Sequence, residues 1–191
     1  MNLWKTWVAA GFCAALIGAL AGAGHAAGPV KIDAAKSQVT ATIRQMGVPV
    51  EGEFRSVSGT VQFDPAAPER GAARLVIDTT TFDLGMRDFN KEVAKTEWLD
   101  SQRHPEAVFT AKGLKPLGGA RYEVTGTLEL KGKTVDLSTE VTVADVDGGR
   151  RFSGAWPLKR QDFDIGSSGW DGVIDDTVLV TFSIFQPHAA P

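Results

Sequence analysis

The chain has 191 residues, a formal net charge of −3 and 43% hydrophobic residues. This length and balance suit one domain with a sizeable core. Because basic residues are scattered singly or in pairs such as Arg150-Arg151, the charge pattern argues against a nucleic-acid-binding protein. The 21 glycines, with abundant Thr and Val, favour short strands and tight turns over helices.

The first 27 residues have the pattern of a secretory signal peptide. Lys5 supplies the positive start, residues 7–20 form an apolar run, and small residues follow at 21–27. The apolar run is short for a membrane span, which leaves a retained membrane anchor as the weaker alternative. The sequence therefore predicts export to the periplasm.

Removal of this segment would leave a single domain over residues 28–191, with cleavage after Ala23, Ala26 or Ala27. The only cysteine, Cys13, lies within the apolar run and would be discarded. A mature chain without thiols excludes disulfides, zinc–thiolate sites and cysteine nucleophiles.

Alternation of apolar and polar residues predicts antiparallel strands along most of the mature chain. Gly52 and Gly59 lie within two of these patterns, where a closing barrel would place bulges or sharp coiling. The expected strands cover residues 37–44, 50–63, 73–80, 107–114, 122–130, 135–143, 151–158 and 177–185.

The most regular stretch runs from Tyr122 to Val143 and predicts a long hairpin with its turn at residues 131–134. Its apolar residues share one face, and charged residues such as Glu129 and Asp136 occupy the other. A charge facing hydrocarbon costs about 2–4 kcal/mol, so the apolar face must point inward and the chain is not an outer-membrane barrel.

Residues 85–98 interrupt the strand pattern, and the spacing of Phe89, Val93 and Ala94 predicts one helix there. Such a helix would cover one mouth of the barrel. The sequence thus predicts an all-β barrel or sandwich of about eight antiparallel strands with one inserted helix. An interior of this size is either filled by side chains or holds one ligand.

Catalytic and metal sites are not expected. The three histidines, His25, His104 and His188, are not placed to share a metal or to activate a nucleophile. Residues 166–169 (GSSG) have the wrong spacing for a nucleophile elbow. The aspartates near them fail the spacing of a calcium-binding EF-hand loop, so they are expected to cap turns.

Short segments in order along the mature chain carry a family resemblance. They are residues 32–33 (ID) with 37–39 (SQV), 46–48 (MGV), 52–54 (GEF), 59–65 (GTVQFDP), 98–100 (WLD), Pro105 with Ala107 and Phe109, 126–128 (GTL), 131–132 (KG), and 158–166 (LKRQDFDIG) with Trp170 and Asp175. Together they resemble the YceI-like family of exported bacterial proteins. The resemblance implies a lipocalin-like antiparallel barrel that binds polyisoprenoid lipids.

Two departures from the family pattern limit what can be carried over. Gln45 stands where many members have histidine, and residues 87–90 (RDFN) lack the histidine usual after Arg-Asp. Head-group contacts of those histidines are therefore not assigned to this chain. Residues 98–100 (WLD) resemble the same segment in a branch of the family whose members occur beside or fused to cytochrome b561-type membrane proteins. This resemblance implies a link to quinones and a candidate membrane cytochrome partner. A second copy of the chain is another candidate partner.

The inward apolar residues either form a packed core or line a tunnel. The resemblance favours the tunnel. Replacing Leu128 and Leu137 with the larger tryptophan should then block lipid uptake. The predicted tunnel residues are Val39, Ile43, Phe54, Val61, Phe63, Ile77, Trp98, Phe109, Val124, Leu128, Leu137, Val141, Trp156, Phe163 and Trp170. The predicted mouth, where a head group would lie, consists of Arg160, Gly166, Ser167, Ser168 and Gly169.

Three functions remain open at this point. The first is a periplasmic binding or carrier protein for an isoprenoid lipid, of quinone or polyprenyl type, which requires no other cofactor. The second is a non-enzymatic interaction module with a filled core, associated with a cytochrome b561-type membrane protein. The third, an enzyme acting inside the barrel, ranks last because Thr139 and Tyr122 are among few inward polar groups.

Overall fold

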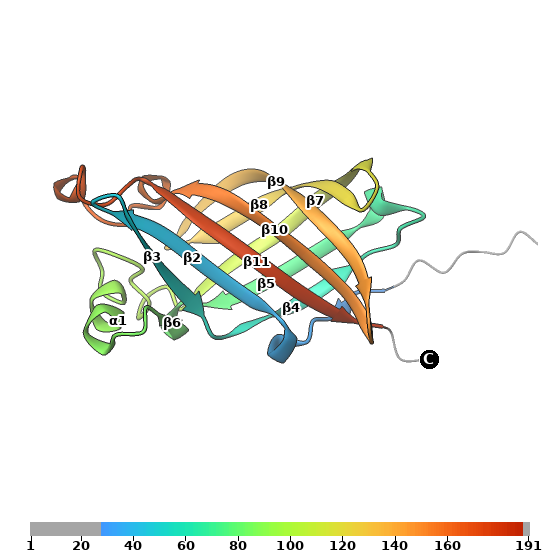
Figure 1. Cartoon of the computed structure of the whole chain (residues 1–191), viewed down its shortest axis with the longest axis horizontal. Coiled ribbons are helices and arrows are strands. Elements are labelled where there is room, and N and C mark those ends of the chain that lie inside the picture. Colours follow the sequence, from blue (N-terminus) through green and yellow to red (C-terminus); the bar gives the residue numbers. More distant parts are fainter. Residues whose placement is uncertain (1–27, 189–191) are drawn as a thin grey trace, which may run out of the picture.

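The strands form one antiparallel sheet that curls into a barrel. The computed structural model describes residues 28–188, so the predicted signal peptide at 1–27 lies outside the described residues. The sheet has 11 strands in the order β1-β4-β5-β7-β8-β9-β10-β11-β2-β3-β6. Helix α1 lies at one end of the barrel, and residues 28 and 188 lie at the opposite end (Figure 1).

The strands vary widely in length, and the longest adjoin the central hairpin. Their bounds are β1 Val30–Lys31, β2 Gln38–Gln45, β3 Val48–Phe54, β4 Val57–Gln62, β5 Ala72–Asp78, β6 Phe82–Asp83, β7 Glu106–Gly118, β8 Arg121–Leu130, β9 Lys133–Val146, β10 Gly149–Lys159 and β11 Thr177–Pro187. The helical segments are α1 Arg87–Val93 and the short 3-10 turns η1 Ala34–Lys36, η2 Pro68–Arg70, η3 Thr79–Thr81, η4 Arg160–Phe163 and η5 Ser168–Trp170.

The all-β class and the inserted helix are confirmed, and the curled sheet is consistent with a lipocalin-like barrel. The count of about eight strands is not confirmed. Strands β1 and β6 have only two residues each, too few for an alternating pattern to reveal them. Residues 50–63, expected as one strand, belong to the two strands β3 and β4, which pair with different neighbours. Residues 46–49, expected as an interruption, contain the Met46-Gly47 turn of the β2–β3 hairpin, where both residues have positive φ.

Helix α1 is shorter than the expected span of 85–98. It begins after Met86 and ends at Val93, with Ala94 as its C-cap. The chain then turns, so that Trp98 and Leu99 are buried in the barrel. Among residues 28–188, no helix has the length and apolar character needed to cross a bilayer.

The central hairpin has the predicted faces and a tighter turn than expected. Strands β8 and β9 pair from Arg121 and Thr142 to Leu130 and Lys133, and the two-residue turn is Lys131-Gly132. Positive φ at both turn residues matches the right-handed twist of the strands. The apolar parity is buried and the charged parity is exposed, as predicted.

Glycines at inward positions make room for aromatic rings from neighbouring strands. A Cβ at Gly126 would lie 2.8 Å from the Phe109 ring, and one at Gly154 would lie 2.7 Å from the Phe182 ring. Gly52 has the same relation to Phe82. The bulge expected at Gly52 or Gly59 is not found, because both ladders run through these residues without a shift in register.

The two ends of the strand order, β1 and β6, do not pair with each other within the described residues. Hydrogen bonds outside the strand ladders close this gap between the two sheet edges, at the end of the barrel away from α1. Gln186 donates its side-chain N–H to the carbonyl oxygen of Val61 at 2.8 Å, and the Asp33 N–H donates to Phe185 at 2.9 Å. The barrel is therefore closed partly by side chains.

We expect Gly59→Ala to lower the free energy of unfolding by about 3 kcal/mol, because Gly59 has φ +143° and an added Cβ would lie 2.1 Å from the Arg74 carbonyl oxygen. Gly113→Ala in β7 is the control, since its nearest neighbour would be Thr125 Oγ1 at 3.6 Å. Denaturant unfolding measures both variants. Equal stability of the two would contradict this account of Gly59.

Candidate binding cavity

The barrel interior contains a cavity of about 390 Å³ with an almost entirely apolar lining. This volume lies within the range of about 300–1,000 Å³ that is typical of small-molecule sites. The lining comes from nearly every strand and from α1, so the cavity extends along the barrel. It could hold an elongated apolar molecule.

Most of the predicted tunnel residues line this cavity. They are Val39, Ile43, Phe54, Val61, Ile77, Trp98, Phe109, Val124, Leu128, Val141, Trp156 and Trp170. Their contact with a lipid stays a prediction. The alternative of a completely filled core does not fit an interior of this volume.

Phe63, Leu137 and Phe163 do not line the cavity. Phe63 packs edge-on against Tyr122 and Phe152, with ring centroids 5.2 Å and 5.5 Å away. Leu137 pairs with Gly126 of the neighbouring strand, and the Phe109 ring lies against Gly126. At this position along the barrel, it is the Phe109 ring that lines the cavity. Phe163, the last residue of η4, is buried in the core.

Several other residues that line the cavity were not predicted from the sequence. Val180, Phe182 and Ile184 of β11 share the inward parity of that strand, so the alternating pattern could have found them. Met86 and Phe89 could not be found in this way, because the position of α1 over the interior depends on tertiary packing.

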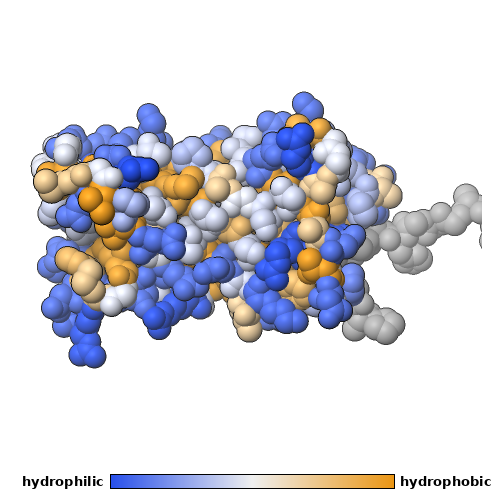
Figure 2. Space-filling model, viewed as in Figure 1, coloured by the Kyte–Doolittle hydropathy of each residue, from blue (hydrophilic) through white to orange (hydrophobic). Residues whose placement is uncertain are grey.

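The cavity reaches the surface beside α1. Met86 and Phe89 line it, and yet their exposed fractions are 53% and 51%. Met46 and Val48, in the β2–β3 turn at the same end of the barrel, are also exposed. In Figure 2, hydrophobic patches gather toward the two ends of the barrel and hydrophilic residues cover much of the remaining face.

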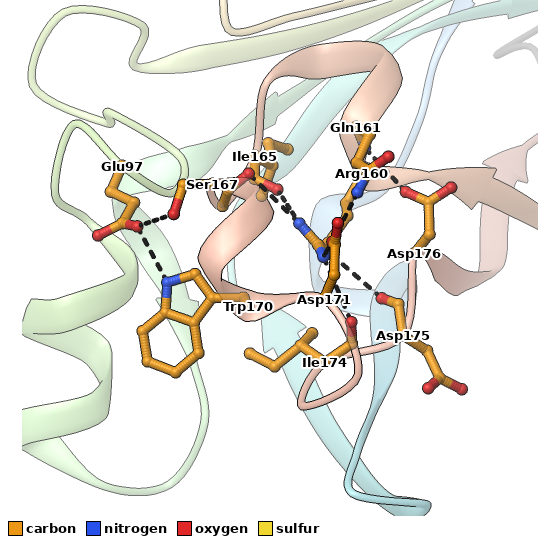
Figure 3. A network of polar contacts seen from close by, with 11 residues as sticks. Glu97, Arg160, Gln161, Ile165, Ser167, Trp170, Asp171, Ile174, Asp175 and Asp176 are labelled. Carbon is orange, nitrogen blue, oxygen red and sulfur yellow. Dashed lines mark hydrogen bonds and ion pairs between the residues drawn. The ribbon is translucent and has the colours of Figure 1, made fainter.

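Arg160, a predicted mouth residue, lies at the edge of the cavity but is only 1% exposed. All five of its N–H groups are engaged (Figure 3). Four bonds go to the carbonyl oxygens of Ile165, Gly166, Ile174 and Asp175, and the fifth goes to the Asp171 carboxylate at 3.0 Å. A head group could bind this guanidinium only by displacing one of these bonds, so Arg160 mainly holds the loop between β10 and β11.

Glu97 ties the segment after α1 to the same loop (Figure 3). Its carboxylate accepts hydrogen bonds from the Ser167 hydroxyl and the Trp170 indole N–H, both at 2.9 Å. These two bonds hold the pKa of Glu97 below its ordinary value of 4.5. The Trp170 ring also packs against Trp98, with centroids 5.3 Å apart. Two segments far apart in sequence thus form one wall at this end of the cavity.

The remaining predicted mouth residues belong to this wall without lining the cavity. Gly166 bonds through its N–H to the Glu97 carbonyl at 2.7 Å. Ser168 and Gly169 lie in the exposed η5 turn, and it is Trp170 that faces inward. Trp170 and its neighbours Ile165 and Ile174 form the lining there, and the head-group role of residues 166–169 stays a prediction.

The aspartates of this loop bind protein groups. Asp171 accepts bonds from Arg160 and Gln161, Asp176 accepts from the Gln161 N–H, and Asp164 pairs with Lys133. Within residues 28–188, no three His, Cys, Asp or Glu side chains gather as metal ligands would.

A family model described as the YceI-like domain matches residues 30–185 of this chain. The chain belongs to the YceI-like family. Among its relatives, a UPF0312 protein from Azotobacter vinelandii is 32% identical over 120 residues, and protein YceI from Escherichia coli O157:H7 is 29% identical over 120 residues. Each match covers 60% of this YceI-like chain and 62% of the relative's own length.

Solved structures share the fold. The crystal structure of Burkholderia cenocepacia BcnA has a TM-score of 0.78 and 39% identity, covering 81% of this chain and 98% of BcnA. A polyisoprenoid-binding domain from Saccharophagus degradans, implicated in plant cell wall breakdown, has a TM-score of 0.66 and 22% identity, covering 84% of this chain and 98% of that domain. At this lower identity the second similarity shows the fold alone.

We expect Arg160→Lys to lower the free energy of unfolding by about 3 kcal/mol or more, because a lysine has fewer donors and would leave buried acceptors unpaired. Arg151→Lys is the matched control. Arg151 is less buried; it donates hydrogen bonds to Lys36 and Ser183 and its guanidinium lies over the Phe185 ring. Thermal and denaturant unfolding measure both. If Arg160→Lys cost no more than the control, the structural role given to Arg160 would be wrong.

The bond between Glu97 and Trp170 should depend on pH. Because the folded pKa lies below the ordinary value of 4.5, the carboxylate stabilises this wall above that pH and progressively less below it. The indole ¹H–¹⁵N resonance of Trp170 should therefore shift with a midpoint below 4.5, and Glu97→Gln should remove the step. A midpoint at or above 4.5 would be inconsistent with the geometry.

Proposed function

We propose that this protein binds and carries an isoprenoid lipid, with the apolar tail held in the barrel cavity and no catalytic step. The observation that carries the proposal is the apolar cavity of about 390 Å³ that opens beside α1. Membership of the YceI-like family and the shared fold of a polyisoprenoid-binding domain support it.

Apolar contact alone can supply a useful affinity. Moving about ten methylene equivalents of a tail out of water yields roughly 8 kcal/mol, at about 0.8 kcal/mol each. This free energy corresponds to a dissociation constant near micromolar before the costs of ordering are included. The tail therefore needs few polar contacts to be retained.

The ligand class we favour is a quinone or polyprenyl lipid, and the compartment is the periplasm. The signal-peptide pattern of residues 1–27 supports the compartment, and the 98–100 segment supports a link to quinones through its resemblance to proteins found beside b561-type cytochromes. A membrane cytochrome would then be the natural partner for ligand exchange. Native mass spectrometry of protein taken directly from its periplasm tests this, since a co-purified isoprenoid species is expected.

Blocking the cavity should abolish lipid uptake. Leu128 lines the cavity, and Leu128→Trp would fill part of it, whereas Leu179→Trp is the matched control because Leu179 is an exposed residue of β11 that does not line the cavity. We expect at least a tenfold loss of geranylgeraniol binding for Leu128→Trp and less than a twofold change for Leu179→Trp, measured by native mass spectrometry on folded protein. Equal binding by the two variants would overturn the cavity assignment.

A further inference from the structure

The opening of the cavity is bordered by the four most exposed large hydrophobic side chains among residues 28–188. Met46 and Val48 of the β2–β3 hairpin have exposed fractions of 77% and 62%, and Met86 and Phe89 at α1 are also more than half exposed. We call these four side chains the rim. Met86 and Phe89 line the cavity, so the apolar surface of the rim continues into the interior. One of the hydrophobic patches in Figure 2 lies at this end of the barrel.

The β2–β3 hairpin carries the inward face of the sheet past the barrel wall. Val48 pairs with Gln45 across the hairpin, and residues paired in this way lie on the same face. Gln45 lines the cavity, as do Ile43 and Val50 further along the same two strands. Val48 therefore belongs to the inward face, at a point where that face has left the shelter of the barrel.

Two residues of the rim stand where the backbone favours a polar side chain. Met46 is the first residue of a two-residue hairpin turn and has φ 50°, a position that favours Asn, Asp or Gly. Met86 is the N-cap of α1 and makes no capping bond, whereas Ser, Thr, Asp or Asn would accept one from the helix. Departures of this kind from local preference lower stability and are expected at functional sites.

Polar contacts hold both parts of the rim in place. The Met46 N–H donates to the Val173 carbonyl oxygen at 2.7 Å, which ties the hairpin to the loop between β10 and β11. On the other side, Asn90 of α1 accepts from the Leu84 N–H and donates to the Asp83 carboxylate, both at 2.7 Å. The exposed side chains are thus presented by fixed elements, so little further ordering is needed when they meet a partner.

The charged groups beside the rim suit a phospholipid surface. Arg44 lies next to the hairpin pair and Arg87 next to the α1 pair; both are exposed, and neither forms an ion pair within the described part of the chain. The acidic residues of α1, Asp88 and Glu92, each pair with a lysine three residues further on. Guanidinium groups beside inserted apolar side chains bind lipid phosphates. Because the backbone of Asp175 bonds to that of Arg44, we expect apolar contact to contribute more than charge.

We propose that the α1 end of the barrel docks on a phospholipid bilayer with the rim inserted, so that lipid passes between membrane and cavity without crossing water. This inference rests on the proposed carrier function and adds the surface with which the protein exchanges its lipid. Passage through water would expose the whole apolar surface of the tail, and contact between the opening and the hydrocarbon avoids that step. A fluid bilayer also accommodates two separate projections, whereas a stable protein interface usually needs about 20–30 residues a side.

Met46→Asn with Val48→Thr removes half of the rim and leaves the cavity intact, since neither residue lines it. Asn suits the turn and Thr suits a strand, so this rim variant should be as stable as the wild type. In flotation assays, the mature chain should bind vesicles of phosphatidylethanolamine and phosphatidylglycerol, and the rim variant should bind them about tenfold or more weakly. The matched control, Leu117→Asn with Val146→Thr, changes exposed apolar residues at the opposite end and should leave vesicle binding unchanged.

A fluorescent label tests the orientation of the bound protein. The predicted mature chain contains no cysteine, so Met46→Cys or Leu117→Cys provides a single labelling site. An environment-sensitive nitrobenzoxadiazole label at position 46 should shift its emission to the blue when vesicles are added, because its surroundings become apolar. The same label at position 117 should keep its emission.

The outcomes separate this inference from the proposed function. A wild type that fails to bind vesicles, equal binding by the rim variant and its control, or the same blue shift at both labelled positions would overturn the docking surface. A dimer that dissociates in the rim variant, without vesicle binding, would overturn it in favour of a second copy. Geranylgeraniol binding without vesicles, measured by native mass spectrometry, should be the same in the wild type and the rim variant. Its absence from a wild type that binds vesicles would overturn the carrier function and leave the docking surface standing.

Discussion

The long strands of this protein have polar side chains on one face and apolar side chains on the other, and a sheet of this kind must hide its apolar face from water. Curling the sheet hides that face within a single layer. The geometry leaves a long interior between opposing walls, and inward glycines such as Gly126 and Gly154 admit aromatic rings from neighbouring strands. These rings narrow the interior without filling it, and the cavity is what remains.

The two ends of the barrel are built differently. Away from α1, aromatic rings pack together, with Phe63 between Tyr122 and Phe152. The other end depends on polar contacts between loops, in which Arg160 and Glu97 are the central groups. Because Arg160 organises backbone carbonyls and Glu97 joins two distant segments, this wall can be rigid while the edge beside α1 stays open. That edge, where the exposed Met86 and Phe89 line the cavity, suits the entry of a lipid tail.

Polar groups inside such a cavity matter because they are few. The apolar lining supplies affinity without discriminating among tails, since transfer free energy follows area and not chemical detail. Selection among lipids then depends on the rare donors and acceptors, because a buried polar group left unpaired opposes the wrong ligand. Apart from tryptophans, the polar and charged residues of the lining are Gln45, Gln62, Glu92, Thr139 and Arg160.

The sequence by itself determined the all-β class, the inward face of the β8–β9 hairpin and part of the cavity lining, because side-chain direction alternates along a strand regardless of what the strand packs against. Its segments also sufficed to place the chain in the YceI-like family. Only the tertiary structure decided that Phe63 packs against Phe152 outside the cavity lining, that the Phe109 ring faces the cavity where Leu137 was expected, and that Arg160 is committed to the loop around it. Those outcomes depend on contacts between strands and loops remote in sequence, and no local pattern records which ring fills the space above a glycine or which carbonyls surround a guanidinium.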